Sequence, residues 1–225
     1  MPRAPVDFDR YAETYDRVLA DSLGTGGDID RFAAYKIDEI AFRLRNCRIQ
    51  RVLDFGCGVG RSLPFIAAAF PEAALWGFDP SPDSVQSAYK RESRAQVTAD
   101  WNEIPAHQFD CVMAANVFHH IPADAREAEM RRCAAALSRV GSLFVFEHNP
   151  FNPLTRRVLE RCPFDRDATL IHRREIIRLG TRAGLRVQRA AFTLFLPFTG
   201  RLLTSLQRGL GWFPLGAQYY VQFVR

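Results

Sequence analysis

Three glycines at alternate positions, Gly56, Gly58 and Gly60, directly follow the apolar segment 51–55 of this 225-residue chain. Glycine has no Cβ, so the backbone of such a turn can adopt positive φ and lie directly against a ligand. A dinucleotide-binding turn, G-x-G-x-x-G, would place its third glycine where Arg61 stands. The segment predicts a nucleotide-like ligand at the end of the first strand of an α/β sheet.

An acidic residue follows at the distance that a bound ribose requires. Asp79 ends the apolar segment 74–79, roughly 20 residues beyond the turn, where a carboxylate can accept hydrogen bonds from both ribose hydroxyls. Pro80 and Ser81 come next, and Ser81 is predicted to cap a helix that begins at Pro82. The turn and Asp79 together favour a nucleoside-containing cofactor.

The run D-F-G-C-G-V-G, residues 54–60, resembles motif I of the class I S-adenosylmethionine (SAM) methyltransferases. The sequence Asp79-Pro80-Ser81 resembles their motif II, and the segment 97–101 resembles motif III. In that family the motif III aspartate accepts from the adenine amino group and its neighbour covers the ring, which implies these roles for Asp100 and Trp101. The alternative for this last pair is that Asp100 caps a loop and Trp101 fills the core.

Residues 7–20 resemble the F-D-x-x-A-x-x-Y-D opening of the ubiquinone and menaquinone type of methyltransferase, in which tyrosines close over SAM. The cofactor that the resemblance implies is therefore SAM. The residues that it assigns to the cofactor are Tyr11, Tyr15, Asp54, Gly56, Cys57, Gly58, Gly60, Asp79, Pro80, Ser81, Asp100, Trp101 and Asn116.

Candidate catalytic residues stand at the ends of the fourth and fifth predicted strands. Methyl transfer from a sulfonium is an in-line displacement, so orientation and exclusion of water supply much of the acceleration. A base is needed only for a hydroxyl or a protonated amine, and histidine is suited to that task. We therefore select His148, His119 and His120, with Glu147 as a base or an orienting group. Because V-x-H-H recurs in the resembled enzymes of many specificities, we expect one of the adjacent pair to be a cofactor-pocket or packing residue.

The elements that must position these residues follow from the apolar pattern. Alternating strands and helices predict a mainly parallel sheet with helices on both faces, and the resemblance implies a Rossmann-like seven-stranded sheet in the order 3-2-1-4-5-7-6 with an antiparallel last strand. Ligands of such sheets lie beyond the carboxyl ends of the strands. The predicted strands are 51–55, 74–79, 95–99, 109–117, 141–147, 185–194 and 217–224. The predicted helices are 61–70, 82–91, 123–138 and 173–183, the last ended by Gly184.

Length and composition favour a single domain over residues 1–225 in the cytoplasm, and the resemblance implies that it is a methyltransferase domain. Five cysteines without a C-x-x-C pair indicate a reducing compartment and argue against disulfides and structural zinc, and no metal site is predicted. The first ten residues are too charged for a signal peptide, and no apolar run reaches the roughly 18 residues of a membrane span.

Three segments, at about 1–30, 150–172 and 195–216, are expected to form a lid. Charge is uneven: residues 1–125 hold 13 Lys+Arg against 18 Asp+Glu, whereas residues 126–225 hold 17 against 7. We expect most of these arginines to lie on ordinary solvated helix faces, and the functional alternative is an anionic or lipid-linked acceptor or peripheral contact with an anionic membrane. The apolar residues of 195–216, with Arg201 and Arg208, suit a membrane interface, a pocket for an apolar acceptor or packing.

The predicted function is SAM-dependent methylation of a small molecule, at oxygen. An NAD-dependent oxidoreductase is an alternative, disfavoured by Arg61 and by the lack of a Tyr-x-x-x-Lys motif. A non-catalytic SAM-binding partner subunit is another, because motifs I to III bind cofactor only. Nucleic acid is not expected, since no N-P-P-Y type motif stands at the fourth strand. The pattern makes no prediction of oligomeric state.

Overall fold

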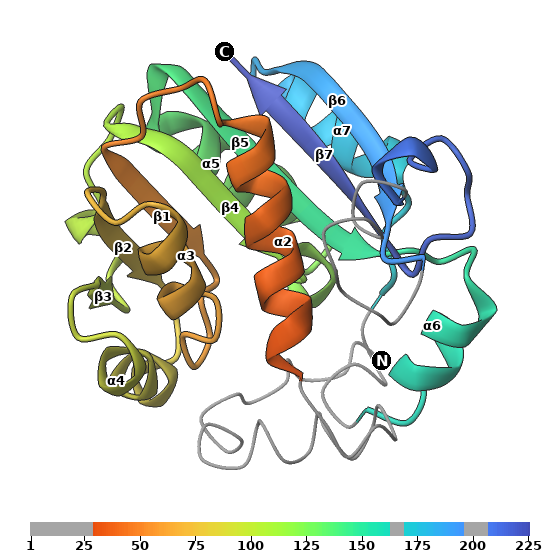
Figure 1. The fold of residues 1–225 in the computed structure, drawn as a ribbon, viewed down its shortest axis with the longest axis horizontal. Coiled ribbons are helices and arrows are strands. Elements are labelled where there is room, and N and C mark those ends of the chain that lie inside the picture. Colours follow the sequence, from red (N-terminus) through yellow and green to blue (C-terminus); the bar gives the residue numbers. More distant parts are fainter. Residues whose placement is uncertain (1–28, 163–168, 196–206) are drawn as a thin grey trace.

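The computed structural model describes residues 29–162, 169–195 and 207–225. Its centre is one seven-stranded sheet in the order β3-β2-β1-β4-β5-β7-β6 (Figure 1). The strands are β1 (Arg51–Phe55), β2 (Ala74–Phe78), β3 (Gln96–Thr98), β4 (Phe109–Ala115), β5 (Leu137–His148), β6 (Arg186–Thr193) and β7 (Gln218–Val224). Strands β1 to β5 pair in parallel, and β7 is antiparallel to both of its neighbours. The predicted fold class and strand order are confirmed.

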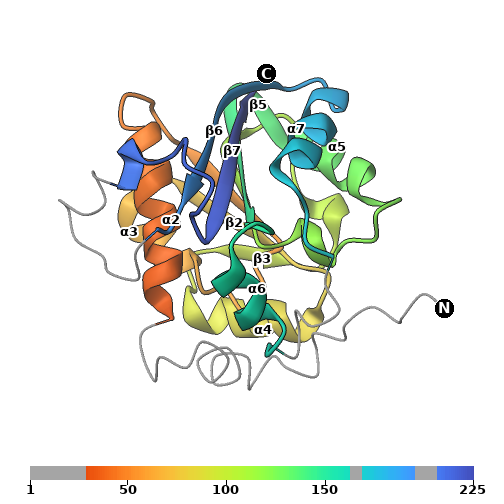
Figure 2. The ribbon, with the colours of Figure 1, turned by 90° about the vertical axis from the view of Figure 1, so that its right-hand side faces the viewer.

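Helices cover both faces of the sheet. Figure 2 shows the sheet between α2 and α3 on one side and α5 and α7 on the other. The helices are α2 (Asp30–Arg43), α3 (Leu63–Ala69), α4 (Pro82–Arg91), α5 (Arg126–Ala136), α6 (Pro153–Leu159) and α7 (Arg173–Arg182), with short 3-10 helices η2 (Trp101–Glu103) and η3 (Phe118–His120). In the part of the chain that the structure describes, no helix is both long and apolar enough to cross a bilayer.

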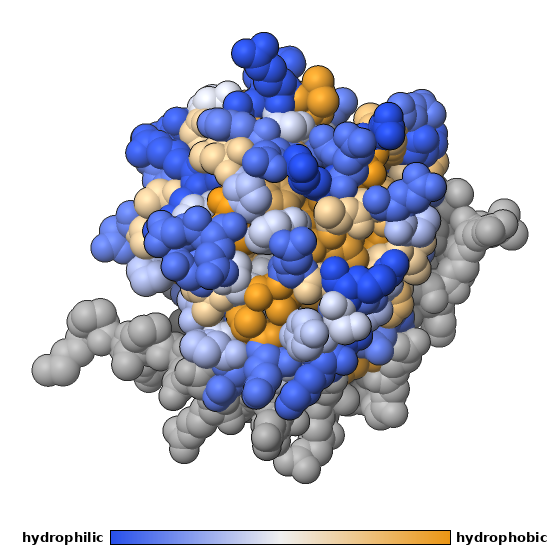
Figure 3. Space-filling model, turned by 90° about the vertical axis from the view of Figure 1, so that its left-hand side faces the viewer, coloured by the Kyte–Doolittle hydropathy of each residue, from blue (hydrophilic) through white to orange (hydrophobic). Residues whose placement is uncertain are grey.

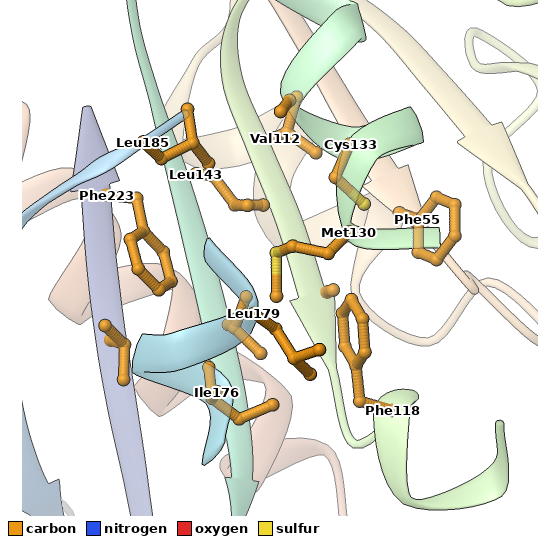
Figure 4. Packing of buried hydrophobic residues seen from close by; sticks show 14 of the residues in the cluster. Phe55, Val112, Phe118, Met130, Cys133, Leu143, Ile176, Leu179, Leu185 and Phe223 are labelled. Atoms are coloured by element: carbon orange, nitrogen blue, oxygen red, sulfur yellow. The ribbon is translucent and has the colours of Figure 1, made fainter. Parts of the chain in front are cut away.

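The face under α5 and α7 holds the larger apolar cluster (Figure 4). Met130 of α5 and Ile176 of α7 point toward the sheet, where Val112 and Leu143 of the central strands are fully buried. Parallel strands covered on both faces need apolar side chains on both, which explains why β4 and β5 appear in the sequence as continuous apolar runs. This packing fixes the carboxyl ends of β4 and β5, where the candidate catalytic residues stand.

The edge of the sheet at β3 is short and polar. Strand β3 pairs with β2 over three residues only, from Gln96 to Thr98. Figure 3 shows this side of the molecule, where hydrophilic side chains surround smaller apolar areas. A short edge strand among polar groups offers little template for pairing with another chain.

Helix α2 was not predicted, because the sequence assigned residues up to about 30 to a lid and no element to the following segment. The composition of its buried face explains why it was missed. Polar residues, Tyr35, Lys36 and Glu39, are buried there beside Ile37 and Ile40. The apolar stripe that would indicate a helix is therefore interrupted. The helix lies along the face of the sheet that α3 also covers (Figure 1). It brings polar side chains to a site that the sequence alone did not connect with them.

One boundary was also wrong. The helix predicted for 123–138 ends at Ala136, and β5 begins at once at Leu137, ahead of the predicted start at residue 141. Leu137 pairs with Phe109, after which the register shifts before Cys111. A Cβ on Gly141 would lie 2.5 Å from the carbonyl oxygen of Phe109, so the strand follows this path only with glycine there.

Candidate active site

The glycine turn joins the carboxyl ends of β1 and β2. The backbone N–H groups of Gly56 and Cys57 both donate to the carbonyl oxygen of Phe78, at 2.7 and 2.9 Å. The N–H of Gly58 donates to Oδ2 of Asp79 at 2.8 Å. These bonds hold the turn and the predicted ribose carboxylate as one unit at the switch point of the sheet, between β1 and β4.

The three glycines of the turn serve different purposes. All have positive φ, +71° for Gly56, +52° for Gly58 and +77° for Gly60. A Cβ would meet Val117 at 2.5 Å from Gly56 and the Cα of Ala88 at 2.6 Å from Gly60, whereas a Cβ on Gly58 would have nothing within 4 Å. Gly56 and Gly60 are therefore required by packing. Gly58 borders open space, which fits the close approach of a ligand such as SAM.

Asp79 and its neighbours form a rigid corner. Oδ1 of Asp79 accepts from the N–H of Ser81 at 3.0 Å. The Ser81 hydroxyl accepts from the N–H of Ser84 at 3.1 Å and so caps α4, as predicted. Pro80 is exposed beside them. Cys57 is buried, and its burial raises the pKa of the thiol well above its usual range. Cys57 is thus a small packing residue at this corner, and Asp79 stands at the end of β2, where the sequence predicts the ribose.

Asp100 and Trp101 have the structural roles that the sequence left open. Oδ1 of Asp100 accepts from the backbone and side-chain nitrogens of Asn102, at 2.9 and 2.8 Å, and caps η2. The Trp101 ring meets Phe55 and Phe78 edge-on, with centroids 5.6 and 5.1 Å apart. Both residues stand at the end of β3 on the cofactor side of the sheet, and the adenine contact remains a prediction.

Histidines gather just beyond the carboxyl end of β4 and at that of β5. Nδ1 of His119 lies 2.6 Å from Oε2 of Glu147, and both side chains are 1% exposed. Oε1 of Glu147 accepts from the N–H of Phe118 at 2.8 Å. The ring of His119 lies 4.0 Å from that of His120 and 5.2 Å from that of His148, between centroids. The structure brings together all four candidate catalytic residues.

The bonds within this cluster separate the two roles considered for Glu147. Both of its oxygens are engaged and it is buried, so it orients His119 and cannot meet an acceptor directly. A carboxylate at Nδ1 favours the tautomer that carries its proton there, which leaves Nε2 as the basic nitrogen. His119 is buried, whereas His120 and His148 are partly exposed. The two outer rings are therefore those that an acceptor can reach.

Asn116 and Gln218 complete the cluster. Nε2 of Gln218 donates to Oδ1 of Asn116 at 3.3 Å and lies 3.5 Å from Nδ1 of His148. Asn116 has a φ of +59°, one of three non-glycine residues with positive φ in the described ranges. Gln218 was not predicted as a site residue, because it is 102 residues from Asn116 and adjoins it only through the pairing of β7 with β5.

A second set of buried polar groups lies under α2. Lys36 is 6% exposed and Asp54 is 2% exposed. Burial lowers the pKa of Lys36 to about 8, and burial, followed by the charge of Asp79, raises the pKa of Asp54 to about 7. The resemblance implied a cofactor role for Asp54, whereas Lys36 was not predicted as a site residue because α2 was not predicted. A signal was present: only two of the 30 basic residues are lysines, Lys36 and Lys90.

The lid segments are described only in part. Tyr11 and Tyr15, with the rest of 1–28, lie outside the described residues, as do 163–168 and 196–206, which include Arg201. Within 150–172, α6 forms where a short helix was predicted, capped by Asn152. Nδ2 of Asn152 donates to the carbonyl oxygen of Leu215 at 2.7 Å, which joins α6 to the segment before β7.

Arg208 does not lie at an exposed apolar surface, one of the settings considered for it. Its Nε donates to Oε2 of Glu39 on α2 at 2.6 Å, and its guanidinium lies 3.8 Å from the centroid of the Phe42 ring. Trp212 and Leu215, by contrast, are exposed, as are Phe151 and Leu154 around the start of α6. No group of metal-binding side chains is arranged for an ion within the described ranges.

The sheet order with its antiparallel last strand, the glycine turn after β1 and the acidic residue at the end of β2 define the class I SAM-dependent methyltransferase fold. Residues 53–143 match the family model described as a methyltransferase domain. This range contains the glycine turn, Asp79, Asp100 and Asn116. The match to a methyltransferase domain thus covers the glycine turn and the three strands after it, and the sheet order agrees with the fold of such domains.

Individual curated proteins are similar to part of the chain. The chain is 34% identical over 120 residues to trans-aconitate 2-methyltransferase of Methylobacterium nodulans, which covers 51% of this chain and 46% of that one. It is 32% identical over 87 residues to trans-aconitate 2-methyltransferase of Mycobacterium marinum, which covers 37% and 32%. The chain thus matches less than half the length of these curated relatives.

Solved structures share the fold at low identity. A TehB-like SAM-dependent methyltransferase from Corynebacterium glutamicum superposes with a TM-score of 0.64 at 18% identity, over 96% of this chain and 98% of that one. Magnesium protoporphyrin IX methyltransferase from Synechocystis, with bound SAM, gives a TM-score of 0.62 at 17% identity over the whole of both chains. The similarity establishes the architecture, and the acceptor has to be inferred from the residues of the site.

Proposed function

We propose that the chain transfers the methyl group of SAM to a small-molecule acceptor, at oxygen. The observation that carries the proposal is the cluster of His119, His120 and His148 behind which Glu147 is buried. A hydroxyl must lose its proton as the new bond to carbon forms, and imidazole is the side chain whose ordinary pKa lies near neutral pH. A cluster of three rings backed by a carboxylate at the strand ends suits that task.

The residues around the glycine turn are assigned to the cofactor. When bound, SAM supplies an electrophilic methyl group on sulfur. Gly58 admits the ligand against the backbone, and Asp79, held by two backbone N–H groups, accepts from the ribose hydroxyls. Trp101 is assigned to the adenine ring of SAM. Tyr11 and Tyr15 are proposed as further contacts from the amino-terminal segment. These residues orient the methyl carbon toward the histidine cluster and exclude water from it.

The histidines are assigned to the acceptor. His148 is partly exposed, with Gln218 on its Nδ1 side, and we assign it the contact with the acceptor hydroxyl. Glu147 is a positioning residue: it orients His119, and its negative charge favours a proton within the cluster. His120 is the other ring within reach of an acceptor.

We further propose an anionic or lipid-linked acceptor. Arg156 and Arg157 are exposed on α6, a few residues beyond His148, and arginine binds carboxylate and phosphate in a bidentate manner. Phe151 and Leu154 add exposed apolar surface at the same place. The relatives named for trans-aconitate make that tricarboxylate one candidate, and the resemblance of residues 7–20 to quinone methyltransferases makes a hydroxylated quinone another. None of the five cysteines, all of which lie in the described ranges, forms a disulfide; this suits a reducing compartment, and we propose the cytoplasm.

Transfer of labelled methyl groups from SAM to a panel of hydroxyl-bearing and carboxyl-bearing small molecules tests this function. We expect His148→Ala to lower turnover of a hydroxyl acceptor by roughly 10²–10⁴ with little change in SAM affinity. Ionised carboxylates need no base, so their turnover should fall much less. His107→Ala is the matched control, because His107 is exposed and pairs with Arg225 outside this cluster.

Other outcomes would redirect the assignment. Loss of turnover in His120→Ala or His119→Ala but not in His148→Ala would place the base on β4. Full activity of all three variants on a hydroxyl acceptor would refute the base. A chain that methylates only nitrogen would contradict transfer to oxygen. A chain that binds SAM and methylates none of the molecules would also contradict it, and would favour a non-catalytic SAM-binding subunit.

A further inference from the structure

Exposed apolar side chains are concentrated in two short segments of the chain. Eight large apolar residues are exposed in the described ranges, and five of them lie within 151–154 and 212–215. The other three stand singly on α4, β5 and β6, and such isolated residues are ordinary on a protein surface. The five residues form the apolar patch: Phe151, Leu154, Trp212, Phe213 and Leu215.

Hydrogen bonds hold the two segments of the apolar patch together. Nδ2 of Asn149 donates to the carbonyl oxygens of Pro214 and Gly216, at 2.9 and 2.7 Å. Nδ2 of Asn152 donates to the carbonyl oxygen of Leu215 at 2.7 Å. Both asparagines are buried, so water does not compete for these bonds. The start of α6 and the segment before β7 are therefore held as one surface, which lies at the right-hand edge of the molecule in Figure 1.

The charges beside the apolar patch are mainly positive. Residues 153–161 expose Arg156, Arg157 and Arg161, against the exposed acid Glu160. The sequence from 195 to 216 contains two arginines and no acidic residue. Guanidinium groups bind phosphate, and basic residues next to an apolar surface are attracted to anionic lipid headgroups. The patch and its arginines are therefore complementary in charge to the surface of an anionic bilayer.

The side chains of the patch also suit a bilayer better than a protein partner. Trp212 is 75% exposed and Leu154 is 72% exposed, so both protrude from the surface. A protein partner needs a pocket matched to each protruding side chain, whereas the boundary of a bilayer accepts apolar side chains in any arrangement. Tryptophan favours this boundary, because its ring is apolar and its Nε1–H can donate to headgroups or water. The ring of Phe213 lies 5.5 Å from that of Trp212, between centroids, and enlarges the aromatic surface.

We propose that the apolar patch and the arginines beside it bind the surface of an anionic lipid bilayer. The apolar side chains enter the boundary of the acyl region, and the guanidinium groups bind lipid phosphates. Asn149, which joins the two segments, directly follows His148, so a bound bilayer lies beside the carboxyl end of β5. Binding at this surface needs neither a particular acceptor nor the cofactor, so it extends the proposed function without depending on it.

Co-sedimentation of the full chain with lipid vesicles tests the proposal. We expect binding to vesicles of phosphatidylcholine mixed with phosphatidylglycerol, and binding about 10-fold or more weaker to phosphatidylcholine alone. High salt should weaken the first of these, because it screens the arginines. The double variant Leu154→Ser/Trp212→Ser should bind the mixed vesicles about 10-fold or more weakly than wild type, since two apolar groups no longer enter the bilayer. Tyr89→Ser/Val140→Ser is the matched control: it removes two exposed apolar residues outside the patch and should bind as wild type does.

Tryptophan fluorescence reports on the patch itself. The chain has three tryptophans, of which Trp76 and Trp101 are partly buried and Trp212 is exposed. Mixed vesicles should move the emission of the wild-type chain to shorter wavelength, because Trp212 leaves water. The double variant, which keeps the other two tryptophans, should show no such shift.

Other occupants of the patch give different results. Vesicle binding that is unchanged in the Leu154→Ser/Trp212→Ser chain, or lost equally in the control, overturns the proposal. Dimers that form without vesicles and are lost in the double variant also overturn it, and assign the patch to a second copy of the chain. Both double variants should bind S-adenosylhomocysteine as wild type does, which shows that they fold. A wild-type chain that binds this ligand but no vesicles contradicts only the membrane surface, whereas one that binds vesicles but not this ligand contradicts only the proposed function.

Discussion

The polar residues near the carboxyl ends of the strands differ in whether the protein supplies hydrogen-bond partners for them. Asp79 and Glu147 each accept hydrogen bonds on both carboxylate oxygens, so their positions are fixed before any ligand arrives. Lys36 and Asp54 are buried without such partners. Carboxylates that the protein already binds, such as Asp79 and Glu147, give a binding site its geometry. Buried charges without a partner, such as Lys36 and Asp54, lower the free energy of unfolding, and a ligand of opposite charge can offset that loss.

Asp54 makes stability depend on pH. Its pKa is about 7 in the folded chain against a usual 3.8, so between these values the folded state holds a proton that the unfolded state has lost. Stability therefore falls as pH rises from about 4 to 7. Lys36, with a pKa of about 8 against 10.5, acts in the opposite direction between those values. We expect Asp54→Asn to melt higher than wild type at pH 7.5, with a flatter dependence of Tm on pH from 4.5 to 7. Parallel curves for the two proteins would refute the assignment.

The glycine turn offers a paired comparison. Gly60→Ala should cost about 2 kcal/mol or more of unfolding free energy, because its Cβ would meet backbone of α4 at 2.6 Å. Gly58→Ala meets no atom of the protein and should cost only about 1–2 kcal/mol from its positive φ. Its Cβ enters the ligand space, so S-adenosylhomocysteine affinity should fall in a folded protein. Denaturant unfolding and calorimetry measure the two effects, and undiminished binding by Gly58→Ala would show that the ligand does not approach there.

At the scale of elements, the sequence predicted what local patterns encode. Strands such as β4 appear as apolar runs, and Ser81 and Gly184 mark helix ends that the structure confirms. Helix α2 was not predicted, because its buried face carries Tyr35 and Glu39, which form hydrogen bonds with Thr193 of β6 and Tyr220 of β7. Such pairs are set by the sheet order and leave no periodic signal in the chain.

Glu39 is the main polar attachment of α2. It is 2% exposed and accepts from the Tyr220 hydroxyl at 2.8 Å, Arg208 at 2.6 Å and Arg43 at 2.7 Å. Removing it leaves several buried or half-buried donors unpaired, so Glu39→Ala should lower the free energy of unfolding by about 3 kcal/mol or more. The exposed Asp38 on the same helix provides the control, since Asp38→Ala should change it by less than about 0.5 kcal/mol. Equal effects in denaturant titrations would mean that α2 is held by apolar packing alone.

At the scale of the whole molecule, the cofactor side was more predictable than the acceptor side. The glycine turn and Asp79 stand within about 20 residues of each other, as the fold requires, and could be recognised from the sequence. The acceptor side draws on β4, β5, β7 and α6. Gln218 reaches Asn116 and His148 only because β7 enters the sheet beside β5. Distant pairing of this kind cannot be inferred from a local pattern, which is why Gln218 and Lys36 were missed.

The central claim is that the glycine turn binds SAM and not a dinucleotide. Thermal unfolding of the full chain with S-adenosylhomocysteine or with NAD tests it most directly. A ligand at about 100 times its Kd adds roughly 2.7 kcal/mol to the stability of the folded state, which should raise Tm by several degrees. We predict that S-adenosylhomocysteine produces this rise and that NAD produces none. A rise with NAD and no response to S-adenosylhomocysteine would contradict the account.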